Sequence, residues 1–206
     1  MTTAHSIDIP SEGQRASYSA IGAKTPFEVP ICSPCLHIVF VATVSLALAA
    51  CSRPGPAAMV PPDLVVRTTS TKSATLKVSV EQMVSMGYSF LEADDLERAI
   101  QTAIEQSHLF GSVSTREGAT ADLALEVDAQ LHTPTGGPTM TAVMTGAWRL
   151  RDARSARVLS ERLVETSGTA GMGDAISALT RTRIAIERAA KKFIRAGIEV
   201  TSRAAF

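Results

Sequence analysis

Cysteine is scarce in this chain and confined to its first quarter, as Cys32, Cys35 and Cys51. Residues 52–206 therefore contain no thiol pair, which excludes an internal disulfide there. That part must be held together by packing alone, which roughly 140 residues can achieve. Cys32 and Cys35 form a Cys-x-x-Cys, but they lack both the thioredoxin-like context and the further ligands of a zinc site, so we expect neither redox nor metal function.

Aromatic residues and net charge are also low. Aromatic residues make up 4% of the chain, so we expect an aliphatic core, and the formal net charge of zero offers no electrostatic reason to bind nucleic acid. Neither Gly-x-Ser-x-Gly nor His-Glu-x-x-His occurs. The sequence therefore predicts no cofactor, no metal and no catalytic residue.

What the chain does have is an uncharged apolar run over residues 38–50 that ends in Leu48, Ala49 and Ala50 before Cys51. The run is too short for a relaxed membrane span but suits the hydrophobic region of a signal peptide. Its end resembles the bacterial lipobox, in which small residues allow the signal peptidase to bind and the cysteine thiol receives diacylglycerol. We therefore expect residues 37–51 to be this signal and lipobox, lipidated at Cys51; the alternative is a buried helix.

The flanks of the lipobox complete the expected organisation. Residues 1–36 are either a disordered extension or the product of a start site assigned too far upstream. Residues 52–63 are rich in proline and are expected to form a linker, and residues 64–206 a single domain. Ser52 stands where an aspartate would retain a lipoprotein at the inner membrane, which favours the periplasmic side of the outer membrane.

The first half of the domain combines a strand with a helix. Apolar and polar residues alternate over 76–80, which predicts a half-buried strand. Ser89 and Glu92 have the spacing of a capping box, and the apolar spacing that follows predicts a helix over about 90–108, with Gly111 as its stop.

The second half predicts three strands and a helix. Alternation over 122–131 and 140–150 predicts two strands, and residues 158–166 form a third, less regular one. With turns between them, the three strands predict an antiparallel meander. Asp174 is the expected N-cap of an amphipathic helix over about 174–201. Its expected buried stripe comprises Ile176, Leu179, Ile186, Ala190, Phe193, Gly197 and Val200. The order β-α-β-β-β-α indicates an α+β two-layer sandwich, a mostly antiparallel sheet with two helices on one face.

This order behind a lipobox resembles two groups of Gram-negative envelope lipoproteins: the auxiliary lipoproteins of ABC-type systems that transport lipid between membranes, and the small lipoprotein of lipopolysaccharide assembly. The segments that carry the resemblance are 96–100, 107–110, 121–127 and 148–152. It implies a non-enzymatic accessory component of an envelope transport or assembly complex, with the membrane and a protein as partners. No catalytic residue carries over.

Two sets of residues could form a lipid or partner surface. The first is basic and comprises Arg188, Lys191, Lys192 and Arg195. It could contact anionic headgroups or an acidic partner, or be an ordinary solvated helix face. The second shares one strand face and comprises Met140, Met144 and Trp148. It could line a lipid-accommodating groove or simply pack in the core.

The remaining polar groups have structural interpretations beside functional ones. Carboxylates of the strands could act as acid and base, but cross-strand ion pairs with Arg149 and Arg151 are the simpler interpretation. These carboxylates are Asp122, Glu126, Asp128, Glu161 and Glu165. His108 and His132 lie at predicted element ends, and the glycines over 168–173 could hold an anion or serve as a connector. A stand-alone ligand-binding lipoprotein and an unrecognised hydrolase or transferase therefore stay open as alternatives.

Overall fold

The computed structural model describes residues 53–66, 69–83, 90–116, 118–133 and 138–204. The predicted extension over 1–36 and the predicted signal over 37–51 lie outside these residues. The described elements, in chain order, are α2 (Pro56–Met59), β1 (Ser73–Met83), α3 (Ala93–Ser107), β2 (Ser112–Ser114), β3 (Leu123–His132), β4 (Met140–Asp152), β5 (Val158–Ala170) and α4 (Ala178–Ala204).

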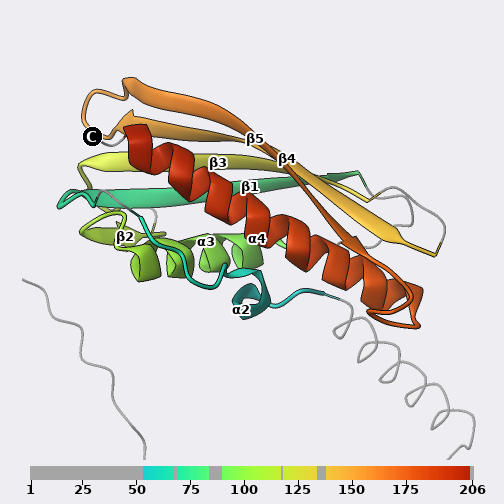
Figure 1. Ribbon diagram of the computed structural model, residues 1–206. Helices are drawn as coiled ribbons and strands as arrows, with labels where there is room; N and C mark the ends of the chain where they lie inside the picture. The colour runs from blue at the N-terminus through green and yellow to red at the C-terminus, as the bar shows by residue number, and fades with distance from the viewer. Residues whose placement is uncertain (1–52, 67–68, 84–89, 117, 134–137, 205–206) are drawn as a thin grey trace, which may run out of the picture. The chain divides into compact units, whose positions relative to one another are not determined.

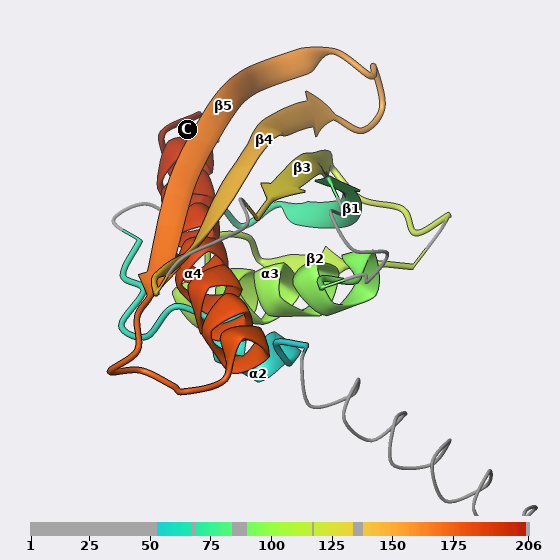
Figure 2. The ribbon, with the colours of Figure 1, turned by 90° about the vertical axis from the view of Figure 1, so that its right-hand side faces the viewer.

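Five strands form one mixed sheet in the order β2-β1-β3-β4-β5. The meander β3-β4-β5 is antiparallel, as predicted, whereas β1 runs parallel to both β2 and β3. Helices α3 and α4 lie together on one face of the sheet, α3 against β1 and α4 against β4 and β5 (Figures 1 and 2). The predicted α+β two-layer sandwich is therefore confirmed, with a sheet of mixed direction.

The sheet buries one face because its strands alternate as the sequence predicts. Along β3, every second residue from Leu123 to Leu131 is buried while the residues between them are exposed or partly exposed. Strand β4 repeats this alternation from Ala142 to Leu150. Side chains of successive residues point to opposite faces of a strand, so the apolar set of each strand faces the helices.

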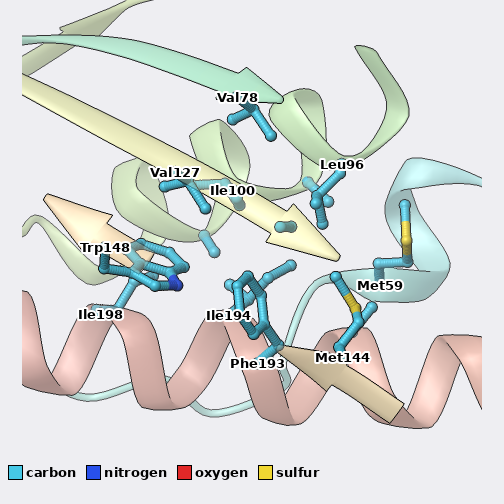
Figure 3. Close-up of a cluster of buried hydrophobic side chains, with 14 of the residues drawn as sticks. Met59, Val78, Leu96, Ile100, Val127, Met144, Trp148, Phe193, Ile194 and Ile198 are labelled. Atoms are coloured by element: carbon cyan, nitrogen blue, oxygen red, sulfur yellow. The ribbon is translucent and has the colours of Figure 1, made fainter. Parts of the chain in front are cut away.

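The core between sheet and helices is tightly filled (Figure 3). The rings of Trp148 and Phe193 lie 5.7 Å apart between centroids, tilted by 52°. Two glycines allow α4 to approach the sheet: a Cβ at Gly197 would overlap the Trp148 ring, and one at Gly168 would overlap the α4 backbone at Ala185. Helix and sheet thus approach more closely than bulkier residues would permit.

The helix boundaries correct three predictions. Helix α3 is N-capped by Glu92 with no side-chain cap hydrogen bond, so Glu92 does not occupy the third position of a capping box, and Ser89 lies outside the described residues. The helix ends at His108 in a left-handed conformation, not at Gly111. Helix α4 begins at Ala178, so Asp174 lies before it and does not cap it.

The N-terminal residues of the described chain are folded onto the domain. Pro56 begins α2, as proline suits the first turn of a helix, and Met59 is fully buried. The Arg195 guanidinium donates to the Pro62 carbonyl oxygen at 2.7 Å, and Arg53 pairs with Glu92 at 2.9 Å. The segment predicted as a linker over 52–63 is therefore packed against the domain from residue 53 onward.

Candidate functional site

The lipobox residues Leu48, Ala49, Ala50 and Cys51 lie outside the described residues, so lipidation at Cys51 stays a prediction. Their distance from the folded domain is nevertheless bounded by the chain. Gly55, the N-cap of α2, follows Cys51 by four residues, which span at most about 14 Å when fully extended. A lipid on Cys51 would hold the domain close to a membrane surface.

Three of the five predicted strand carboxylates surround Arg149 in ion pairs on the exposed face of the sheet. Arg149 lies at the centre, with its guanidinium 2.7 Å from Glu161, 3.2 Å from Asp128 and 3.4 Å from Glu126. Arg151 contacts Glu126 at 3.0 Å. Hydrogen bonding and charge from Arg149 lower the pKa of Glu161, and the same contacts raise the pKa of Arg149. Glu161 is therefore held in its ionised form, and all three carboxylates are engaged in cross-strand ion pairs with Arg149.

The two histidines do not join these carboxylates. His108 is exposed at the end of α3 in the helical layer, on the other side of the sheet. His132 is exposed at the end of β3, four residues and so about 13 Å along the strand from Asp128. Within the described ranges, no group of His, Cys, Asp and Glu could hold a metal ion. The carboxylates around Arg149 and the two histidines therefore do not converge.

Four cations of α4 do converge, around a surface hollow of about 320 Å³. The hollow is lined by Pro61, Pro62, Gly168, Thr169, Arg188, Lys191, Lys192 and Arg195. The Lys192 ammonium donates to the Ser167 carbonyl oxygen at 2.9 Å, and Arg188 donates to that of Thr169 at 2.6 Å. We call the four cations with their hollow the basic surface.

Asp174 is the carboxylate that contacts this surface. Its oxygens accept from the Arg188 guanidinium and from the Gly171 amide, and these two contacts lower the pKa of Asp174. Glu187, also on α4, instead pairs with Arg183 at 3.5 Å. The basic surface therefore keeps a positive balance in the residues that line it.

The second predicted surface, formed by Met140, Met144 and Trp148, is mostly buried. Met144 is fully buried and Trp148 is 2% exposed, both in the core between sheet and helices, while Met140 is partly buried at the start of β4 (Figure 3). Trp148 and Met144 stand on the inner face of the sheet, where the helices cover them, and Trp148 contacts Phe193 and Gly197 of α4. The core-packing interpretation holds, and no groove opens at these residues.

The sequence-based prediction missed the loop between β5 and α4. Arg181, expected off the buried stripe, is 6% exposed and donates to the carbonyl oxygens of Ala175, at 3.0 Å, and Ile176. Its guanidinium also lies 2.9 Å from the Met172 sulfur. Ile176 and Leu179, expected in the stripe, are instead 87% and 54% exposed. Ile176 was misassigned because the predicted helix began four residues before the observed start of α4, whereas Leu179 lies in the first turn of α4 and is exposed there.

None of the helices over residues 53–204 that the structure describes is long and apolar enough to cross a membrane.

Comparisons identify the fold but no sequence family. The sequence matches no family model, and no curated protein is similar to it. Protein XCC0632 from Xanthomonas campestris, described as DUF330, superposes with a TM-score of 0.52 at 15% identity, over 70% of this chain and 91% of that one. The hypothetical protein CT253 from Chlamydia trachomatis gives 0.50 at 8% identity, over 67% and 98%. A putative lipoprotein from Caulobacter crescentus gives 0.41 at 17%, over 61% and 89%. The chain shares its fold with the first two proteins.

Proposed function

We propose that the chain is a lipid-anchored lipoprotein on the periplasmic side of the outer membrane, and that its domain is a non-enzymatic accessory component of an envelope transport or assembly complex. One relationship carries the proposal. The lipobox ends four residues before the N-cap of α2, and α2 is packed into the domain through Met59. A lipid on Cys51 would therefore hold a folded protein surface at the membrane, where a membrane complex could bind it.

The polar groups support a binding role over a catalytic one. The strand carboxylates around Arg149 are occupied by ion pairs, and both histidines are exposed and distant from them. An acid–base mechanism needs a titratable group with a partner within hydrogen-bond distance of a substrate. The basic surface and the loop before α4 are two exposed regions that could take part in binding.

The anchor is tested by replacing the lipidated atom. Cys51→Ser should leave the domain folded but remove it from the membrane fraction, because the thioether carries the diacylglycerol. Each buried CH₂ of an acyl chain contributes roughly 0.8 kcal/mol, so a multiply acylated protein should remain bound. Palmitate labelling and fractionation measure this, with Ser52→Ala as the matched control. Wild type that takes up no label contradicts the proposal.

The complex is tested by affinity capture of the tagged full chain from membranes in mild detergent. Components of an envelope transport or assembly system should be recovered with wild type and depleted with Cys51→Ser. Recovery of no envelope component from wild type contradicts an accessory role. A stand-alone lipid carrier would need a pocket between sheet and helices, where Trp148 and Phe193 fill the space instead (Figure 3).

A further inference from the structure

The loop over residues 171–177 is held in place by contacts from two arginines of α4. Arg181 is buried, with 6% of its surface exposed, and its guanidinium donates to the carbonyl oxygens of Ala175 and Ile176. Arg188 pairs with Asp174, whose carboxylate also accepts from the Gly171 amide at 2.9 Å. The loop conformation is thus fixed by polar contacts and does not depend on burying its apolar side chains.

Those apolar side chains are displayed to solvent. Met172 is 55%, Ile176 87% and Leu179 54% exposed, within eight successive residues. Scattered exposed apolar residues are common on proteins. Here Met172 and Ile176 stand on a loop that polar contacts hold in shape, and Leu179 is in the first turn of α4 beside it, which indicates a contact surface. We call these three residues the apolar tip.

Positive charge lies directly beside the apolar tip. Helix α4 carries seven Lys or Arg and two Glu, a net charge of +5 in a chain whose formal net charge is zero. Arg188 joins the two features, since it contacts Asp174 in the loop and also lines the hollow of the basic surface. Apolar side chains flanked by cations are the composition of a peripheral membrane contact.

The position of the expected anchor agrees with this orientation. Pro61 and Pro62, which follow α2, form part of the hollow itself, and Arg195 holds the Pro62 carbonyl. Helix α2 packs against α4, and the loop leads into the N-terminal end of α4 (Figures 1 and 2). Two residues of the segment that follows Cys51 therefore line the basic surface itself.

We infer that the apolar tip and the basic surface dock together onto an anionic phospholipid leaflet: Met172, Ile176 and Leu179 enter the headgroup region while the four cations contact phosphate groups. The inference rests on the proposed anchor, which brings this surface to the membrane. Docking would fix the orientation of the domain on the leaflet, with the sheet's ion-paired face turned away and available to a partner.

The experiment uses the lipidated protein reconstituted in vesicles of phosphatidylcholine with phosphatidylglycerol. Ile176→Cys is labelled with an environment-sensitive fluorophore; Cys51 is blocked by its thioether, and Cys32 and Cys35 are removed with the signal. The emission at residue 176 should shift to the blue and be quenched by a quencher in the acyl chains. Leu163→Cys, 79% exposed on β5, is the matched control and should report water.

A second variant tests the charges. Lys191→Gln with Lys192→Gln should reduce the blue shift at residue 176, as should replacing phosphatidylglycerol by phosphatidylcholine. Lys72→Gln with Lys77→Gln, exposed cations near and on β1, should leave it unchanged. If the protein is palmitate-labelled and membrane-bound but the fluorophore at residue 176 reports an aqueous environment, docking is contradicted and the anchor is not. If the protein takes up no palmitate, the anchor is contradicted. If added vesicles then still shift the emission of the fluorophore at residue 176 to the blue, docking is supported without the anchor.

Discussion

The Trp148 indole of strand β4 lies directly against the backbone of Gly197 in helix α4, with no side chain of the helix between ring and backbone at this point. Trp148 is 2% exposed, and its ring nitrogen is buried with no hydrogen-bond partner among the described residues. An unsatisfied buried N–H is costly, so the packing of the ring must outweigh that cost. The contact with Gly197 is part of that packing.

We expect Gly197→Ala to destabilise the domain by about 1–3 kcal/mol, the usual cost of overpacking a core. The added methyl would overlap the Trp148 ring, and the ring or the helix must move. Urea unfolding followed by Trp148 fluorescence measures the change. Gly173→Ala, where a Cβ meets nothing within 4 Å, is the control and should unfold like wild type. Equal midpoints for both variants would contradict the contact.

Met59→Ala should destabilise the domain by about 2–5 kcal/mol, as removal of a buried methionine does. The reason is that Met59 of α2 is fully buried in the core. Val65→Ala, in the same segment but 84% exposed, should change the unfolding free energy by less than about 0.5 kcal/mol. Indistinguishable unfolding of Met59→Ala and wild type would mean that residues 53–62 are a linker after all.

Asp122 should make stability depend on pH. The backbone N–H of Ser73 donates to its carboxylate at 3.1 Å and the Ser73 hydroxyl at 3.0 Å, and both bonds lower the pKa of Asp122 from 3.8. A lowered pKa contributes stability that is present above 3.8 and is lost as pH falls through the folded-state value.

Asp122→Asn should therefore be less stable than wild type at neutral pH, and the difference should shrink as pH falls below 3.8. Thermal unfolding over acidic pH values measures it. Ser73→Ala removes the hydroxyl donor but keeps the amide, so it should weaken the same pH dependence without abolishing it. A constant difference between Asp122→Asn and wild type at all pH values would exclude this role.

Arg149→Met should make stability sensitive to salt. Without the guanidinium, Glu126, Asp128 and Glu161 lose a shared counter-charge and repel one another. Added salt screens repulsion between exposed charges, so the melting temperature of the variant should rise with sodium chloride more than that of wild type. Arg162→Met, an exposed cation of β5, is the control. Parallel salt curves for wild type and Arg149→Met would contradict the network.

The sequence allowed the strands of the meander to be predicted because each buries one face. Leu123 to Leu131 alternate with polar residues, and only a strand places every second side chain on one side. The same periodicity could not give the partner of β1. Alternation of apolar and polar residues predicts which face of β1 is buried. It does not predict the parallel pairing of Ala74 with Leu123, which depends on the path of the chain that connects β1 to β3. Strand β2, with three residues of which two are serine, has no periodicity to detect.

Periodicity also explains which part of the candidate site could be predicted from the sequence. The four cations share a helix face, so helical spacing grouped them, and the structure places all four at one hollow. Spacing could not show that Arg181 turns back to the loop carbonyls, since that contact depends on where α4 begins. Met144 and Trp148 were ambiguous because an apolar strand face looks the same over a core as over a groove.

The packing of α2 has a mechanical consequence for an anchored protein. If Cys51 carries the lipid, any tension between membrane and domain enters through α2. The described residues before β1 take part in no strand pairing. Side-chain contacts such as that of Met59, and single backbone hydrogen bonds such as that from the Ser70 amide to the Leu109 carbonyl oxygen, would therefore bear this load before the ladder does. Residues 53–72 could then extend by as much as about 70 Å before the β1–β3 ladder is loaded. While α2 stays packed, the domain is held close to the membrane; if tension releases α2, the distance between membrane and domain can increase.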